Sequence, residues 1–172
     1  GNSYGHWGGG LYAEDSNGVV EDCLFQNNTG GQEGGGAKSH QSGATFRNCS
    51  FVDNACTIKG GGLSWYFGPL VLEQCNFLSN SAGSRGGGFE CHEGNQCDVT
   101  NTIVAGNDAP NGGGGIYFEV QTAVLQNCTV SNNTTEGAGG GILVERSAAT
   151  IRNCILSGST GHAIYEATEQ DD

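Results

Sequence analysis

Residues 34–59 read GGGAKSHQSGATFRNCSFVDNACTIK, and residues 60–85 repeat the same plan as GGGLSWYFGPLVLEQCNFLSNSAGSR. Each segment opens with three glycines and then holds three short β-like runs. The first run follows the glycines, the second ends in an amide or an acid, and the third begins at a cysteine. No helical periodicity is present. Three short strands and three turns in one such segment predict a coil of parallel β-helix.

The same plan recurs along the chain. Glycine triplets open six copies, at Gly8, Gly34, Gly60, Gly86, Gly113 and Gly139. One residue is inserted near Asn111 and Gly112, and all other copies keep the same length. The sequence therefore predicts an all-β fold, a right-handed single-stranded parallel β-helix of about six coils, with residues 1–172 as one segment. Because the first residues read as the tail of an incomplete coil, we expect a fragment of a longer secreted protein.

Stacking the coils tests this prediction, because a parallel β-helix places equivalent residues about 4.8 Å above one another. Three columns of equivalent positions are apolar throughout and predict the walls of one core: Val20, Phe46, Leu72, Val99, Leu125 and Ile151; Leu11, Ala37, Leu63, Phe89, Ile116 and Ile142; Phe25, Phe51, Phe77, Val104, Val130 and Leu156. A neighbouring outward column is mostly polar. It places Arg47 between Glu21 and Glu73, where we expect surface ion pairs of ~0.2–1 kcal/mol.

Two further columns are rich in amides, and we expect both to be buried at turns, since asparagine tolerates left-handed backbone angles and can satisfy turn amides. One follows the second strand: Asp22, Asn48, Gln74, Asn101, Asn127 and Asn153. The other follows the third strand: Asn28, Asn54, Asn80, Asn107 and Asn133. A buried amide cannot carry a glycan. Of the N-x-Ser/Thr sites, we therefore expect glycosylation at Asn27 and Asn132 and none at Asn48, Asn127 or Asn133.

Composition limits the function. Six lysines and arginines stand against 18 acids, so the formal net charge is −12. This charge argues against nucleic acid or an anionic membrane surface as the main partner. No apolar run approaches the ~20 residues of a transmembrane helix. Eight cysteines fit an oxidising compartment, and we expect the protein to be extracellular or at the cell surface.

The cysteines fall into two groups. One column holds Cys23, Cys49, Cys75, Cys128 and Cys154, which we expect to be inward thiols that act as small apolar fillers. Cys91 and Cys97 lie on inward columns of successive strands in one coil, and we expect a disulfide between them. Cys56 has no obvious partner. The spacing that a metal site needs is missing, and we expect neither a metal nor another cofactor.

A resemblance rests on two elements of the repeat. Phe25-x-x-Asn28 precedes Gly34-Gly35-Gly36-Ala37, and Phe51 to Asn54 and Phe77 to Asn80 continue the pattern. This pairing resembles the FxxN and GGA-hydrophobic repeat of the chlamydial polymorphic membrane proteins. Copies four to six depart from it, since valine or leucine replaces the phenylalanine. The resemblance implies a β-helical passenger at a cell surface, often adhesive.

One outward column could carry acid–base chemistry: Glu14, His40, Tyr66, His92, Glu119 and Glu145. We expect Tyr66 to lie between His40 and His92, which would suit proton abstraction and donation on a uronate chain. Such chemistry needs cations near the substrate carboxylate, and only Lys38 lies close in the sequence pattern. A surface ladder of compensating charges is the alternative reading.

Exposed aromatic residues offer a binding surface. Tyr12, Tyr66 and Tyr117 lie on or near the first run of their coils, where their rings could stack on sugars or on another protein. We therefore expect a non-enzymatic, extracellular β-helical segment for adhesion, surface display or assembly. Its partners would be other subunits, within a homo-oligomer or filament, or cell-surface glycans. The alternative is a polysaccharide lyase or epimerase with its site at His40, Tyr66 and His92.

Overall fold

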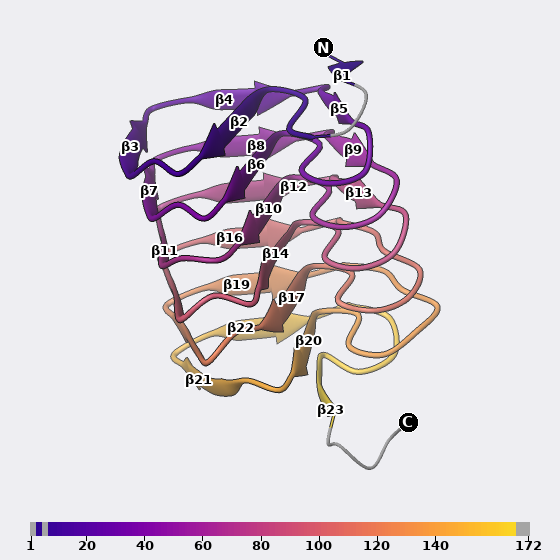
Figure 1. Ribbon diagram of the computed structural model, residues 1–172. Coiled ribbons are helices and arrows are strands. Elements are labelled where there is room, and N and C mark those ends of the chain that lie inside the picture. The colour runs from indigo at the N-terminus through magenta and orange to yellow at the C-terminus, as the bar shows by residue number, and fades with distance from the viewer. Residues whose placement is uncertain (1–2, 5–6, 168–172) are drawn as a thin grey trace.

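The computed structural model describes residues 3–4 and 7–167 and is an all-β solenoid of stacked parallel strands (Figure 1). Its widest sheet, here the first sheet, contains β2 (Leu11–Glu14), β6 (Ala37–His40), β10 (Leu63–Tyr66), β14 (Phe89–His92), β17 (Ile116–Glu119), β20 (Ile142–Glu145) and β23 (Ile164–Ala167). The predicted β-helix is confirmed. None of the described residues forms a helix that could cross a membrane.

Two sheets of six strands complete the coils. The second sheet contains β3 (Gly18–Glu21), β7 (Ala44–Arg47), β11 (Leu70–Glu73), β15 (Gln96–Thr100), β18 (Thr122–Gln126) and β21 (Ala148–Arg152). The third contains β4 (Leu24–Gln26), β8 (Ser50–Val52), β12 (Asn76–Leu78), β16 (Ile103–Ala105), β19 (Thr129–Ser131) and β22 (Ile155–Ser157). A fourth, short sheet was not predicted: β1 (Ser3–Tyr4), β5 (Thr29–Gly30), β9 (Ala55–Cys56) and β13 (Ser81–Ala82).

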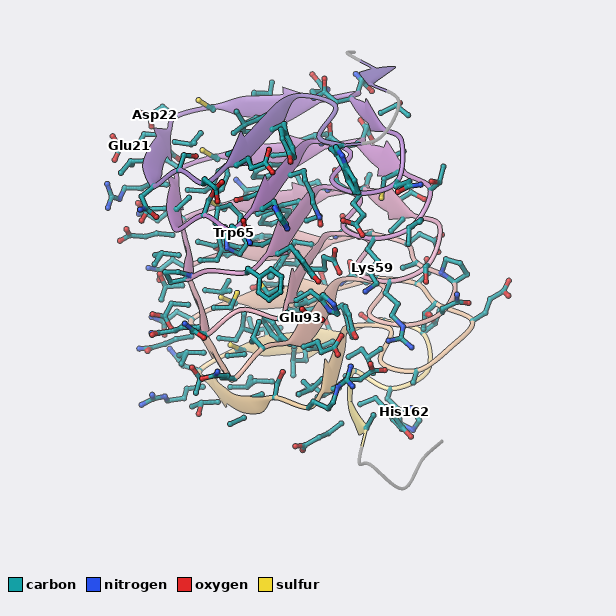
Figure 2. All side chains as sticks on the ribbon, viewed as in Figure 1. Glu21, Asp22, Lys59, Trp65, Glu93 and His162 are labelled. Atoms are coloured by element: carbon teal, nitrogen blue, oxygen red, sulfur yellow. The ribbon has the colours of Figure 1, made fainter. Side chains whose placement is uncertain are left out.

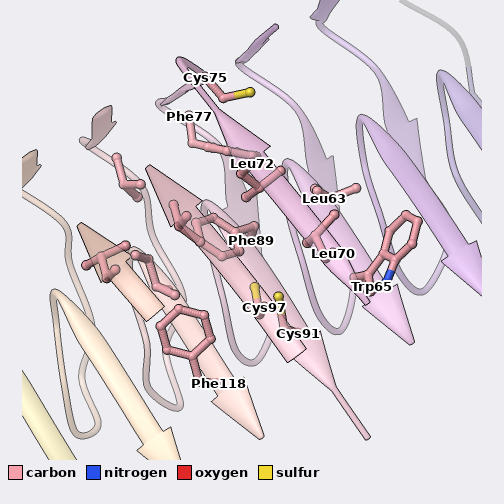
Figure 3. Close-up of a cluster of buried hydrophobic side chains, with 14 of the residues drawn as sticks. Leu63, Trp65, Leu70, Leu72, Cys75, Phe77, Phe89, Cys91, Cys97 and Phe118 are labelled. Carbon is pink, nitrogen blue, oxygen red and sulfur yellow. The ribbon is translucent and has the colours of Figure 1, made fainter. Parts of the chain in front are cut away.

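The strand register reproduces the predicted columns. Leu63 pairs with Ala37 and Phe89, and Leu72 pairs with Phe46 and Val99. The three apolar columns face a single core, part of which is drawn in Figure 3. Within this core the rings of Phe25, Phe51 and Phe77 stack with centroids 4.7 Å apart. On the outer side of the second sheet, Arg47 pairs with both Glu21 and Glu73, as expected.

The asparagine column that follows the third sheet is buried, as predicted. Asn54 shows the pattern: its backbone N–H and its side-chain N–H both donate to Oδ1 of Asn80, at 3.0 and 2.9 Å. The same side chain also donates to the carbonyl of Phe25, at 2.9 Å. Asn80 repeats these bonds to Asn107 and Phe51. The ladder thus satisfies the polar groups of a buried turn.

The prediction that the other amide column is buried was wrong. Its members take positive φ angles, as expected of a turn, yet Asn48 and Asn127 are exposed. Their side chains bond to one another along the surface, for example from Asn48 to Asp22 at 2.6 Å. At this sharp bend the left-handed residue points its side chain away from the core. Burial therefore gives no reason to exclude glycans from Asn48 or Asn127.

The glycine triplets mark a corner where coils meet backbone to backbone. Gly34 has a φ of +66°, a region that L side chains rarely adopt. A Cβ on Gly36 would lie 2.6 Å from the carbonyl oxygen of Gly62 in the next coil. Both positions therefore require glycine. This corner brings the residue before each triplet over the outer side of the first sheet, which shapes the groove described below.

The cysteine column is buried in the middle coils, as predicted, whereas Cys23 in the first coil is exposed and Cys154 in the last is only partly buried. Cys49, Cys75 and Cys128 are buried, and each thiol donates to the carbonyl two residues before it. Thr102 fills the gap in the column and makes the same bond with its hydroxyl, at 2.9 Å. Burial raises the pKa of Cys75 to about 11. These thiols are inert fillers, because the thiolate is the reactive form.

Cys91 and Cys97 lie side by side within the core, where Figure 3 labels both. Each is a free thiol in the structure. Burial, and then contact with Cys97, holds the pKa of the Cys91 thiol well above its usual value. Their disulfide stays a prediction, which a nonreducing peptide map would check. Cys56 packs with Ala82 and Ala109 in a small separate apolar cluster.

Candidate functional site

A groove of about 480 Å³ lies on the outer side of the first sheet. Its lining residues are Trp7, Tyr12, Glu14, Glu33, Lys38, His40, Lys59, Tyr66 and His92. Three columns form it. Two come from alternate outward positions of the strands, and the third comes from the residues before the glycine triplets, of which Glu33 bridges to both Trp7 and Lys59. Figure 2 labels Lys59, from the loop before β10, and Glu93, from the turn after β14.

His40, Tyr66 and His92 are the last residues of β6, β10 and β14, and their rings stack along the groove. The centroids of His40 and Tyr66 are 5.4 Å apart, and those of Tyr66 and His92 are 5.1 Å apart, with nearly parallel planes. The predicted order, with Tyr66 in the middle, is confirmed. Because the rings cover each other's faces, they present their polar edges to the groove.

Carboxylates hold this stack from one side. Nδ1 of His92 lies 2.6 Å from Oε2 of Glu119, and Nε2 lies 3.4 Å from Oε1 of Glu93. Tyr66 donates its hydroxyl to Glu93 at 2.9 Å. Burial lowers the pKa of His92, and the ammonium of Lys59 lowers it further. Burial and Lys59 thus favour the neutral imidazole of His92, a form that can accept a proton.

Beneath the groove lies a chain of buried polar groups from successive coils. Lys38 pairs with Glu33 and donates to Oγ of Ser64 at 3.1 Å. Ser64 in turn donates to Oε1 of Glu90 at 2.7 Å. Oε2 of Glu90 is buried without a hydrogen-bond partner and lies 3.9 Å from Nζ of Lys59. Burial is the main cause that raises the pKa of Glu90 to about 7.

A family model described as a right-handed β-helix region matches residues 2–155. The chain belongs to the right-handed β-helix family. No curated protein and no solved structure matched the chain.

Two features of this β-helix correct the expectations for its surface. Tyr117 is fully buried, so it cannot contact a ligand. The guanidinium of Arg85 covers the Tyr117 ring. The Tyr117 hydroxyl donates to Glu119 at 2.6 Å and also lies 2.8 Å from Glu145. By contrast, 42% of Tyr12 is exposed, and Tyr66 is partly exposed. Trp7, at 36% exposure, adds an aromatic wall that the sequence analysis did not assign to the site.

The β-helix also gathers its cations on this face. Lys38 was expected to be alone, yet Lys59, Arg85 and Arg146 also contact residues of the first sheet. Lys59 and Arg85 come from the column before the glycine triplets, which is bridged from coil to coil. Lys59 and Arg85 are one repeat apart in the sequence, and this spacing could have predicted that they lie on the same face. Each cation has an acidic partner, so the groove carries both signs of charge.

The acids of the groove are paired with other side chains. Across residues 3–4 and 7–167, no three or more His, Cys, Asp or Glu side chains are arranged to hold a metal ion. The carboxylates of the groove pair with lysine, arginine, tyrosine or histidine instead. What this arrangement offers a ligand is a set of hydrogen-bond donors and acceptors beside two exposed aromatic rings.

Proposed function

We propose that this β-helix is an extracellular, non-enzymatic surface segment that binds an extended saccharide chain in its groove, in the service of adhesion, surface display or assembly. The observation that carries the proposal is the combination of Trp7 and Tyr12 with the polar edges of the stacked rings along one groove. Sugars present apolar ring faces and many hydroxyls, and such a surface complements both.

The form of the groove supports a chain as the ligand. Equivalent positions stack from coil to coil, so the groove presents a row of polar and aromatic side chains along the solenoid, which an extended chain can contact at several points. The mixed charges favour hydroxyl groups over a bare strong ion, because most of the cations already have partners. The resemblance to the chlamydial polymorphic membrane proteins supports a place at the cell surface, with glycans or other subunits as partners.

The proposal is tested with Tyr12→Ala, which removes an exposed ring from the groove wall. In binding assays on immobilised glycans we expect an affinity loss of about fivefold or more, since truncating an anchoring contact residue costs roughly 1 kcal/mol or more. Leu24→Ala is the control, because Leu24 is an exposed apolar residue on the outer side of β4, away from the groove. Equal binding by both variants, or binding by neither the wild type nor the control, would refute the proposal.

A second candidate is acid–base catalysis on a saccharide chain, as a lyase or epimerase. It is favoured by the position of His92, which lies between the carboxylates of Glu119 and Glu93, at 2.6 and 3.4 Å, so that groups able to exchange protons adjoin the groove. Incubation with uronans, with and without Ca²⁺, would reveal unsaturated or epimerised products. We expect none if the groove only binds, and product formation that His92→Gln abolishes would replace the first proposal with the second.

A further inference from the structure

Lys59 differs from the other basic residues of the groove in the strength of its pairing. Lys38 is buried, pairs with Glu33 and donates to Ser64, so its ammonium is occupied. The side chain of Lys59 is 22% exposed and lines the groove, and its ion-pair partner is Oε2 of Glu90 at 3.9 Å. This distance is longer than a hydrogen bond. Lys59 is therefore held less tightly than Lys38, by this long ion pair and by the Tyr117 ring 5.5 Å from its ammonium, and it can turn to a ligand.

The carboxyl group of Glu90, in contrast to the ammonium of Lys59, is fixed in position. Its side chain is 1% exposed, and Ser64 holds one of its oxygens. The other oxygen is buried without a hydrogen-bond partner and lies 3.9 Å from Nζ of Lys59, whose charge balances it more than that of Lys38 does. A buried carboxylate without a close cation tends to take up a proton. The charge that restrains Lys59 therefore depends on whether Glu90 is ionised.

We propose that Lys59 is a proton-linked contact for an acidic group, a carboxylate or a sulfate, on the chain bound in the groove. The inference rests on the proposed function, because it requires a saccharide chain to be seated there. When Glu90 is ionised it holds Lys59 by charge. When Glu90 is protonated, Lys59 has no acidic partner at that position and is free to pair with the ligand. By linkage, binding of the acidic group favours proton uptake at Glu90.

Several other groups face Glu90, and none of them can take the place of Lys59. Lys38 and Ser64 come from β6 and β10, and Glu33 comes from the loop before β6. Tyr117 pairs with Glu90 in the register of β14 and β17, but its hydroxyl bonds to Glu119 and Glu145. The thiol of Cys56 is close enough for Glu90 to contribute to its raised pKa of about 12, so it stays neutral. The titration near neutral pH thus belongs to Glu90, whose pKa is about 7.

The experiment is calorimetric titration at pH 6 and pH 8 with three oligosaccharides of equal length: a neutral glucan, a carboxylated uronan and a sulfated glucan. Affinity scales with the fraction of protein in the competent state. With the pKa of Glu90 at about 7, that fraction falls about tenfold from pH 6 to pH 8. We expect acidic chains to bind up to about tenfold more tightly at pH 6, and the neutral chain to bind equally at both pH values. The uronan and sulfate arms identify which acid the site takes.

Three variants isolate the mechanism. Glu90→Gln keeps the size of the side chain without its charge, and should bind acidic chains at pH 8 as tightly as the wild type does at pH 6. Lys59→Gln should lose the preference for acidic chains, so that the uronan and the sulfated glucan bind no more tightly than the neutral glucan at either pH. Arg152→Gln removes an exposed cation from β21, far from the groove in the coil, and should change nothing.

The outcomes separate this inference from the proposed function. His40 and His92 also line the groove, and a pH slope that they carry would survive in Glu90→Gln and overturn the inference. Neutral and acidic chains that bind alike at both pH values would also overturn it while leaving the proposed function standing. If no chain binds the wild type at either pH, both fall.

Discussion

At the scale of single residues, Glu90 is a buried carboxyl group whose pKa is raised by burial. It lies on β14, where the outward position is closed over by the loop that carries Lys59. The repeat places Glu90 in an outward column with Lys38, Ser64 and Tyr117. The side chains of such a column are ordinarily exposed to solvent. The burial of Glu90, like that of Tyr117, depends on the corner that folds over the first sheet. Periodicity identifies stacked neighbours and does not report what covers them.

This burial should make stability depend on pH. Burial raises the pKa of Glu90 from 4.5 to about 7, so the folded state holds its proton over a range where the unfolded chain has lost it. Stability is therefore fully present below pH 4.5 and falls as pH rises through 7, by about 3 kcal/mol. We expect Glu90→Gln to be more stable than the wild type at pH 8, with a smaller difference at pH 4, in urea unfolding.

Glu136→Gln serves as the control for that measurement, because Glu136 is an exposed turn residue. Its stability relative to the wild type should change by less than about 0.5 kcal/mol over the same range. A Glu90→Gln profile parallel to that of the wild type would show that the folded state does not hold the extra proton.

At the scale of elements, the buried asparagine ladder joins the turns that follow the third sheet. Asn80 accepts two N–H groups of Asn54 and donates to Phe51 and Asn107. Its removal leaves at least two buried groups without partners, at roughly 1–3 kcal/mol each. We expect Asn80→Ala to lower the free energy of unfolding by about 3 kcal/mol in chemical denaturation.

Asn76→Ala is the matched comparison, since Asn76 lies in the same coil with its side chain on the outer side of β12. Its effect should stay within about 0.5 kcal/mol. Similar losses for the two variants would mean that the ladder is not what stabilises the turn.

Much of the arrangement of strands and turns could be predicted from the sequence. The repeat placed every apolar column and the ladder, because a strict period fixes which residues stack. It failed at the turn after the second sheet, where Asn48 and Asn127 point outward. A left-handed asparagine suits either an inward or an outward amide, so residue type cannot decide its direction. The fourth sheet was missed because two-residue strands carry no alternation.

At the scale of the whole molecule, the groove and the proposed glycan sites belong to different sides of the coil. Asn27 and Asn132 are exposed on the turn that follows the third sheet, whereas the groove lies over the first sheet. Sugars on these asparagines would leave the groove open. After secretion from a glycosylating host, intact-glycopeptide mass spectrometry should find glycans at Asn27 or Asn132, and none at the buried Asn133. Occupancy of Asn133 would contradict its place in the ladder.

The asparagine ladder has one more property, which follows from the direction of its bonds. Between ladder residues every described bond runs the same way, from an N–H in one coil to an oxygen in the next, through Asn54, Asn80, Asn107 and Asn133 to the hydroxyl of Ser159. Only the bonds from the side-chain amides to backbone carbonyls run back to the preceding coil. The amide dipoles therefore add along the axis, with the positive end towards the C-terminal coil. Aligned amides polarise one another. The solenoid thus has an electrical polarity as well as a chain direction, and its central links should be the strongest.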